Sequence, residues 1–195
     1  VVSYLISGLN PAIILSHCIY HQDIRNLGSK NAGFTNFKRV YGNRYAWFVF
    51  ALDILKSVFL CTVFGIAFQH VFGYFHLGAS YAGFFAMLGH SYPIWYQFKG
   101  GKGFLVGATA IWFIDWRVAL IAAAVMLILL FTVKYMSLSA ICSSIVCPIL
   151  LAVFTVEHPA ILVFCTLSVL LLIWRHRGNI VRLLHGTESK FSLTK

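Results

Sequence analysis

Residues 98–134 read FKGGKGFLVGATAIWFIDWRVALIAAAVMLILLFTVK, and this stretch decides the fold. It contains two apolar segments, residues 104–116 and 118–133, which meet around the charged residues Asp115 and Arg117. A helix of about 20 apolar residues crosses the roughly 30 Å core of a bilayer, and short or tilted spans deviate from that length. The stretch therefore predicts two membrane helices behind a basic, glycine-rich loop.

The composition of the whole chain is that of an integral membrane protein. Of 195 residues, 60% are hydrophobic and only 10% are charged, whereas soluble domains have about 25% charged residues. The 15 Lys and Arg residues exceed the 5 Asp and Glu residues, which gives a formal net charge of +10. The apolar runs leave no soluble basic domain for nucleic acid. Membrane lipids and phosphorylated substrates are the expected partners.

Five further apolar segments complete an all-α, polytopic fold of seven transmembrane helices in one domain, residues 1–195. The expected spans are residues 1–20, 46–68, 77–96, 104–116, 118–133, 138–154 and 160–174. If residues 104–116 and 118–133 formed one helix, the number of spans would fall to six. No internal repeat or linker is detected. Residues 1–16 lack a basic n-region, so the first segment is expected to remain as a membrane helix.

The positions of the lysines and arginines favour seven spans, because basic residues accumulate in cytoplasmic loops. With seven spans, Arg117 is the one basic residue on the outer face and Lys56 lies within the second span. The amino terminus is then expected outside and the carboxyl terminus in the cytoplasm. The three polar segments described below are then expected on the cytoplasmic face of the cell membrane. The protein is expected to be a monomer.

The five cysteines indicate neither a disulfide framework nor a metal site. Their number is odd, most lie inside apolar runs, and no Cys-x-x-Cys spacing occurs. We interpret them as packing residues, and no metal or other cofactor is expected.

The loop after residue 97 predicts a phosphate site at the membrane surface. It contains Lys99, Gly100, Gly101, Lys102 and Gly103. Glycines allow positive φ and close backbone approach, so N–H groups can converge on an anion while lysines supply countercharge. The alternative is a basic turn that follows the positive-inside rule.

A second polar segment follows the first span. Ser29, Asn31, Thr35 and Asn36 can donate hydrogen bonds to an anion, or they can form turns and helix caps. Arg39 can bind phosphate through its planar guanidinium. Together these residues favour a ligand.

A third polar segment follows the last span. At helical spacing, His176 and Asn179 share a face and can point into one site. Glu188 is the only acidic residue in the tail and is expected to pair with a basic loop. Arg175 and Arg177 are interpreted as markers of the cytoplasmic boundary.

Asp53, Lys56 and His90 are ionisable residues within the second and third predicted spans. Asp53 and Lys56 are three positions apart in the second span, where they are expected to neutralise each other or to face the site. They could also orient the cytoplasmic loops. His90 lies about two helical turns before the glycine-rich loop, and it is either a hydrogen-bonded packing residue or a member of the site.

The three polar segments together resemble the bacterial acyl-phosphate:glycerol-3-phosphate acyltransferase family over nearly the whole chain. Residues 28–36 resemble the family motif Gly-Ser-Gly-Asn-x-Gly-Ala-Thr-Asn, with Lys30 and Phe34 in place of small residues. The segments Gly-His-x-x-Pro and Phe-Lys-Gly-Gly-Lys-Gly match residues 89–93 and 98–103. The motif His-Arg-x-Asn-Ile-x-Arg-Leu-x-x-Gly-x-Glu-x-Lys matches residues 176–190 at every fixed position.

The resemblance implies transfer of a fatty acyl group from acyl phosphate to the 1-hydroxyl of glycerol 3-phosphate, which gives lysophosphatidic acid and phosphate. This is an early step of phospholipid synthesis and needs neither acyl-CoA nor a metal. The implied catalytic residues are Ser29, Arg39, Lys102, His176 and Asn179. The implied substrate-binding residues are Lys99, Gly100, Gly101, Gly103, Asn31, Thr35, Asn36, His90, Ser137 and Glu188.

The sequence leaves open the proton acceptor in the reaction and two rival functions. His176 can act as general base, since its unperturbed pKa is about 6.5, or the departing phosphate can accept the proton. The rival functions are an anion or lipid-headgroup transporter and an inactive lipid-binding paralogue. The departures at Lys30 and Phe34 keep the inactive paralogue open as an alternative, whereas inverted repeats typical of transporters are not evident.

Overall fold

The computed structural model describes residues 1–154 and 157–191, and every regular element in that part of the chain is a helix. This confirms the all-α prediction. The expected first span, residues 1–20, is broken into α1, Val2–Ser7, and α2, Pro11–Tyr20. The side chain of Asn10 accepts hydrogen bonds from the backbone N–H groups of Ala12 and Ile13, so it caps α2 while Pro11 occupies its first position.

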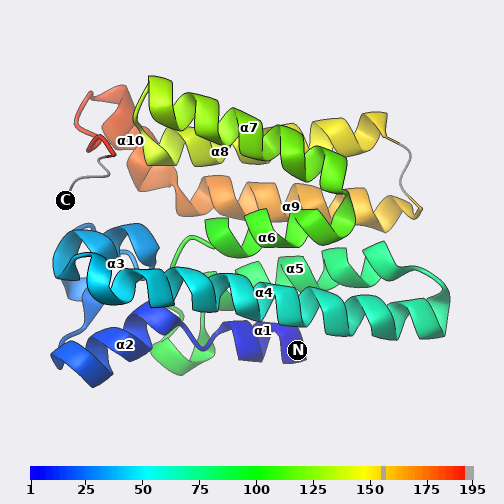
Figure 1. Cartoon of the computed structure of the whole chain (residues 1–195), viewed down its shortest axis with the longest axis horizontal. Coiled ribbons are helices and arrows are strands. Elements are labelled where there is room, and N and C mark those ends of the chain that lie inside the picture. Colours follow the sequence, from blue (N-terminus) through cyan, green and yellow to red (C-terminus); the bar gives the residue numbers. More distant parts are fainter. Residues whose placement is uncertain (155–156, 192–195) are drawn as a thin grey trace.

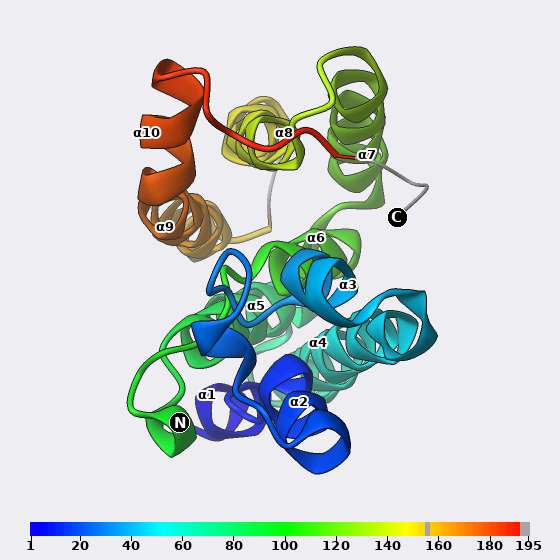
Figure 2. The same ribbon diagram turned by 90° about the vertical axis from the view of Figure 1, so that its left-hand side faces the viewer.

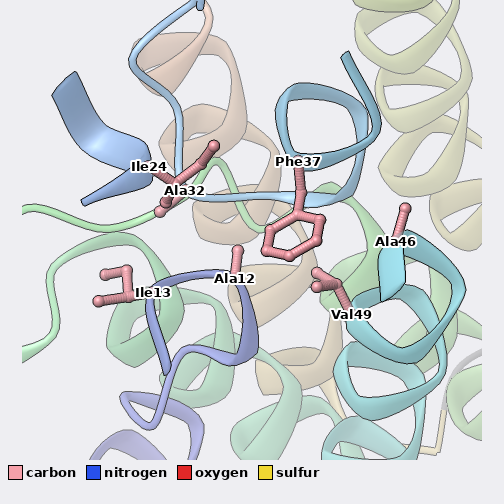
Figure 3. Close-up of a cluster of buried hydrophobic side chains, with 7 residues drawn as sticks. All are labelled: Ala12, Ile13, Ile24, Ala32, Phe37, Ala46 and Val49. Carbon is pink, nitrogen blue, oxygen red and sulfur yellow. The ribbon is translucent and has the colours of Figure 1, made fainter. Parts of the chain in front are cut away.

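The segment between the first two spans contains a helix that the sequence pattern did not predict. It begins with a short 3₁₀ turn, η1, Ile24–Asn26, and continues into α3, Phe34–Tyr41. One aromatic side chain fixes α3: Phe37 is fully buried against a cluster that also contains Ala12, Ile13, Ile24, Ala32, Ala46 and Val49. Figure 3 shows its ring between α2 and the start of α4. Burial of such a ring contributes about 1.5–3 kcal/mol.

A long helical hairpin forms the centre of the molecule. It consists of α4, Asn43–Phe72, and α5, Phe75–Ser91, joined at Gly73. The two helices pack so closely that a Cβ atom on Gly78 would lie 2.2 Å from the carbonyl oxygen of Phe64. The expected third span, residues 77–96, ends early because Pro93 cannot continue the helix. Its last residues form a separate 3₁₀ turn, η2, Ile94–Tyr96.

The helices α6, Phe104–Ile114, and α7, Trp116–Thr132, are separate, as the seven-span prediction requires. Asp115 is extended, and its carboxylate accepts hydrogen bonds from the backbone N–H groups of Arg117 and Val118. The residue therefore ends α6 and caps α7. The 11 residues of α6 rise only about 16 Å at 1.5 Å each.

The last three helices are α8, Met136–Val153, α9, Pro159–Arg175, and the short α10, Arg177–Leu184. Between the axes of α9 and α10 the chain bends by 56° at His176. In Figure 1 most helices lie along the long axis of the molecule, and α3, α10 and the carboxyl-terminal segment gather at its left end. Figure 2, viewed from that end, shows α7 to α10 above α1 to α6.

Three helical segments of the described chain are long and apolar enough to cross a membrane: Val2–Tyr20, Asn43–Phe72 and Met136–Val153. A fourth is obtained if α9 and α10 count as one bent span. Large apolar side chains such as Leu55 and Phe59 on α4 are more than half exposed. A surface of this kind suits lipid rather than water, so the fold is that of an integral membrane protein.

Candidate active site

A cavity of about 650 Å³ lies at the end of the molecule where α3, α10 and the carboxyl-terminal segment meet. All three polar segments contribute to its wall. The predicted site residues that line it are Ser29, Asn31, Thr35, Asn36, Arg39, His90, Lys102, Gly103, Ser137, His176, Asn179 and Glu188. Lys99, Gly100 and Gly101 are not among the described residues that line the cavity. The structure thus brings most of the predicted set together.

A chain of hydrogen bonds joins the glycine-rich loop to α10. The Nζ atom of Lys102 donates to Oδ1 of Asn179 at 2.6 Å, and Nδ2 of Asn179 donates to Oε1 of Glu188 at 2.6 Å. Hydrogen bonds to charged partners are the strong ones. Asn179 therefore connects a cation and an anion on one wall of the cavity.

Glu188 is held by the protein through both carboxylate oxygens. Ser137 donates to Oε1 at 2.7 Å, and Nε of Arg182 donates to Oε2 at 2.7 Å. Burial alone would raise the pKa of Glu188, but hydrogen bonds from Asn179, Ser137 and Arg182 outweigh it and hold the pKa below its ordinary value. A fixed carboxylate of this kind orders its donors and would repel a phosphate. Glu188 was expected to pair with a basic loop, but its ion-pair partner Arg182 lies on the helix α10.

Lys102 lies in the loop before α6 among several cations. Burial lowers the pKa of its ammonium group to about 8; Glu188 opposes this change, while Arg182, Arg175 and Arg39 reinforce it. Like charges and desolvation both disfavour the protonated form. An anion bound in the cavity would relieve the repulsion, which is the electrostatic pattern of an anion site.

His176 occupies the bend between α9 and α10 and is only 3% exposed. Its Nδ1 lies 2.9 Å from the carbonyl oxygen of Leu172. Because a carbonyl oxygen only accepts, Nδ1 carries the proton, and Nε2 of a neutral ring is left as an acceptor. An acceptor nitrogen in the cavity can take a proton from a hydroxyl group.

Gly100 and Gly101 support the cavity from behind. Their N–H groups donate to the carbonyl oxygens of Ser91 at 3.2 Å and His90 at 3.0 Å. The expectation that these two N–H groups bind an anion is therefore wrong for this structure: they bind the end of α5. Side chains at these positions would collide, since a Cβ atom on Gly101 would lie 2.1 Å from Nε2 of His90 and 2.6 Å from the carbonyl oxygen of Ala32.

Arg175 fixes the other side of the same loop. Its Nε donates to the carbonyl oxygen of Gly101 at 3.0 Å, and its Nη2 donates to that of Gly100 at 3.0 Å. Arg175 is therefore not only a marker of the cytoplasmic boundary, because it connects the end of α9 to the glycine-rich loop. Arg177, by contrast, donates to the carbonyl of Trp174 and is exposed.

The amino terminus of α6 opens onto the cavity. Gly103 precedes it with φ +79°, a conformation that favours glycine. No side chain caps the helix, and Gly103, Phe104 and Leu105 all line the cavity. The first N–H groups of a helix and its dipole attract anions. Lys102 and this terminus therefore offer groups that can bind an anion, whereas the N–H groups of Gly100 and Gly101 are bonded to the end of α5.

The loop before α3 is organised by Asn36. Its Oδ1 accepts from the backbone N–H of Ser29 at 2.8 Å, and its Nδ2 donates to the carbonyl of Leu27 at 3.0 Å. This supports the turn-forming interpretation of Asn36. Ser29 and Asn31 line the cavity from this loop, and Thr35 lines it from the first turn of α3.

The two departures from the family motif have different structural consequences. Lys30 is exposed and has φ +57°, a conformation in which a side chain is strained. Phe34 begins α3, and its ring centroid lies 5.2 Å from those of both Trp47 and Phe50. Phe34 therefore fastens α3 to α4 through aromatic contacts.

At the outer edge of the cavity, Nη2 of Arg39 donates to Oγ of Ser189 at 3.3 Å. Lys99 is exposed, and its carbonyl oxygen accepts from Nη1 of Arg25 at 3.5 Å. Sequence reasoning missed Arg182, which lines the cavity one helical turn after Asn179. Its position three residues after Asn179 was the available signal.

A second, apolar cavity of about 270 Å³ lies among α5, α6, α7, α8 and α9. Its wall includes Met87, Trp112, Ala119 and Leu172, and Phe104 lines both this cavity and the polar one. An apolar compartment of this kind can hold a hydrocarbon chain beside the polar site.

The described residues contain no group of three or more His, Cys, Asp and Glu side chains that could hold a metal ion. All five cysteines are free thiols.

The chain is similar to known proteins over nearly its whole length. The model of a family described as glycerol-3-phosphate acyltransferase matches residues 1–186. A glycerol-3-phosphate acyltransferase of Thermoanaerobacter pseudethanolicus is 38% identical over 190 residues, which cover 97% of this chain and 92% of that protein.

Two solved structures have the same fold. Crystal structures of PlsY, an integral membrane glycerol 3-phosphate acyltransferase, match with TM-scores of 0.84 for the glycerol 3-phosphate form and 0.80 for the lysophosphatidic acid form. They are 32% and 30% identical in sequence, cover 98% and 97% of this chain, and are themselves covered to 92%. This chain therefore belongs to the glycerol-3-phosphate acyltransferase family.

Proposed function

We propose that this protein transfers a fatty acyl group from an acyl phosphate to the 1-hydroxyl of glycerol 3-phosphate, which yields lysophosphatidic acid and inorganic phosphate. The observation that carries the proposal is the cationic cavity in which Lys102, Asn179 and His176 meet at the amino terminus of α6. Relatives named for this activity, and PlsY structures in glycerol 3-phosphate and lysophosphatidic acid forms, support it.

Both proposed substrates carry phosphate, and the cavity offers several cations for it. We place the phosphate of glycerol 3-phosphate at Lys102 and the first turn of α6. Arg39 and Arg182 line the same cavity and can stabilise the phosphate of the donor. Ser29, Asn31 and Asn179, which also line the cavity, would polarise the acyl carbonyl.

The reaction needs no covalent enzyme intermediate. The glycerol oxygen forms a bond to the acyl carbon while the bond from that carbon to the phosphate oxygen breaks, and phosphate departs with the electron pair. The hydroxyl proton passes to Nε2 of His176 or to the departing phosphate. Positioning and charge stabilisation supply most of the rate.

The acyl tail is proposed to enter the apolar cavity, with Phe104 at the junction of the two compartments. The apolar walls lie within the helices that we assign to the bilayer, so a donor dissolved in the membrane can reach them laterally. The reacting phosphate then stays at the polar end.

The proposal includes seven membrane spans in a monomer, with the amino terminus outside and the active site at the cytoplasmic face of the cell membrane. The separation of α6 from α7 at Asp115 supports the odd number. The basic residues of the three polar segments support the orientation.

The test is an assay of the purified protein in lipid with labelled glycerol 3-phosphate and either palmitoyl phosphate or palmitoyl-CoA. Labelled lysophosphatidic acid is expected from palmitoyl phosphate alone. If neither donor gave lysophosphatidic acid, the proposed enzymatic activity would be refuted. If only palmitoyl-CoA gave it, the assignment of acyl phosphate as the donor would be wrong. Mutation of His176 to Asn, with the pH profile of turnover, separates the two proton acceptors: an unchanged profile with residual activity would exclude the base role.

A further inference from the structure

A buried ionic cluster beneath the glycine-rich loop has no part in the reaction described so far. It consists of Asp53 and Lys56 on α4 and His90 on α5, and the side chains of Asp53 and His90 are 3% and 4% exposed. The predicted pairing of Asp53 with Lys56 is confirmed: Oδ1 and Nζ lie 2.8 Å apart. Asp53 and His90 also line the catalytic cavity.

The ammonium group of Lys56 forms an ion pair with Asp53 and hydrogen bonds with His90 and Ser7. Nζ lies 2.8 Å from Oδ1 of Asp53, 3.0 Å from Nδ1 of His90 and 3.2 Å from the carbonyl oxygen of Ser7. An ammonium group donates three hydrogen bonds and accepts none. Its closest contact with the ring therefore requires that Nδ1 of His90 be the acceptor.

This requirement fixes the tautomer of His90. If Nδ1 accepts a proton from Lys56, the ring proton of the neutral histidine must be on Nε2. The competing arrangement has Nδ1 donating to Oδ1 of Asp53, which is more distant at 3.3 Å. That arrangement would also place an N–H group 3.0 Å from an ammonium group that cannot accept it.

His90 lines the substrate cavity, and its Nε2 lies on the side of the glycine-rich loop. A Cβ atom on Gly101 would lie 2.1 Å from Nε2, so this nitrogen lies directly against the glycine-rich loop. Within residues 1–154 and 157–191, no hydrogen-bond partner of Nε2 is found. With the ring proton on Nε2, this N–H group can donate to a ligand or to water in the cavity that His90 lines.

We propose that Lys56 and Asp53 are positioning residues that hold His90 as a neutral Nε2–H donor to the phosphate of the acceptor substrate. Asp53 compensates the charge of Lys56 within the bilayer, and Lys56 sets the tautomer. The identification of the ligand as glycerol 3-phosphate rests on the proposed function, whereas the tautomer of His90 does not. The two cavity histidines then have opposite roles, since His176 presents an acceptor nitrogen and His90 presents a donor.

The tautomer is tested directly, without substrate, by nitrogen-15 NMR of histidine-labelled protein in lipid nanodiscs. The signals of His90 are identified by their loss in His90→Gln. A pyridine-type shift for Nδ1 and a pyrrole-type shift for Nε2 are expected. A pyrrole-type shift for Nδ1 would overturn the proposal, whether or not the protein proves to be an acyltransferase.

The functional arm uses the charge-neutral double variant Asp53→Asn with Lys56→Met, which leaves no unpaired charge in the membrane. In the wild-type background the variant is expected to raise the KM for glycerol 3-phosphate on the order of tenfold, as loss of an orienting partner typically does, with kcat within about twofold. His90→Gln keeps an amide donor near the Nε2 position and has no tautomers. In that background the same double variant is expected to change the KM by less than about twofold, because no tautomer remains to be set.

A purely structural role gives a different pattern. Equal losses in the wild-type and His90→Gln backgrounds, or a fall in kcat with an unchanged KM, would refute the proposal. Arg117→Met, which removes the exposed ion pair with Asp115 at the other end of the molecule, is the matched control and should leave the KM unchanged. Thermal unfolding of every variant shows that the protein compared is folded.

Discussion

Lys102 and Asn179, 77 residues apart in the sequence, are joined by a 2.6 Å hydrogen bond between Nζ and Oδ1. This bond connects the loop before α6 to α10. The other end of the Asn179 amide, Nδ2, donates a hydrogen bond to Glu188. The bond therefore joins two polar segments that the membrane helices separate in sequence.

Loss of the Lys102 ammonium should be far more damaging than loss of Lys99. Lys102→Met is expected to lower kcat/KM on the order of 100-fold or more, because a buried charge that stabilises the transition state is removed. Lys99→Met should cost less than about threefold, since its side chain is exposed and outside the cavity lining. Steady-state kinetics with both substrates measure the ratio, and equal losses would contradict the site.

The activity should decline in mildly alkaline solution. Burial lowers the pKa of Lys102 to about 8 in the free protein, and only the protonated form attracts phosphate. Below this pKa the binding form predominates, so kcat/KM should fall as the pH rises through about 8. Lys102→Arg keeps its charge at this pH and should lose the alkaline limb while retaining some activity. A limb that persists unchanged in Lys102→Arg would assign it to another group.

A single methyl group at Gly101 should disrupt the site. Gly101→Ala would place Cβ against Nε2 of His90 and the carbonyl oxygen of Ala32, and overpacking costs about 1–3 kcal/mol. The matched control is Gly178→Ala on α10, where the nearest atom is 3.7 Å away and alanine favours a helix by up to about 1 kcal/mol. Thermal unfolding and turnover should fall for the first variant and not for the second; equal behaviour would contradict the tight packing.

Lys30→Gly should stabilise the protein although it removes a cation beside the cavity. Lys30 has φ +57°, and glycine relieves the strain for a net gain of up to about 1 kcal/mol. Gly28→Ala, in the same loop with φ +56°, should have the opposite effect, since its Cβ would lie 2.4 Å from Oδ1 of Asn36. Melting temperatures that move in the same direction would refute this prediction.

The length of the apolar cavity should set the preferred acyl chain. Ala119→Leu fills the cavity wall on α7 and should lower the ratio of rates with octadecanoyl and dodecanoyl phosphate by several-fold, because each buried methylene contributes about 0.8 kcal/mol. Leu120→Phe adds volume to the neighbouring position, which is 49% exposed, and should leave the ratio unchanged. An unchanged ratio in Ala119→Leu would place the tail elsewhere.

The sequence predicted the helical fold and the meeting of three polar segments, because apolar runs of membrane length and basic loops have few other solutions. Hydrogen-bond partners were harder to predict. The pattern of Gly100 and Gly101 indicates that another group approaches the backbone closely, but that group can be a ligand or a carbonyl group of the protein. In this structure the carbonyl oxygens of Ser91 and His90 accept the hydrogen bonds from the two N–H groups. Arg175 was misinterpreted for the same reason, since an arginine at a membrane boundary can also bind a loop.

The most direct test is the stoichiometry of one reaction with the purified wild-type protein in lipid. Palmitoyl phosphate and glycerol 3-phosphate are supplied, and lysophosphatidic acid and inorganic phosphate are both quantified. Equal amounts of the two products, formed only when glycerol 3-phosphate is present and abolished by Lys102→Met, are predicted. Release of phosphate without lysophosphatidic acid would identify a hydrolase and contradict acyl transfer.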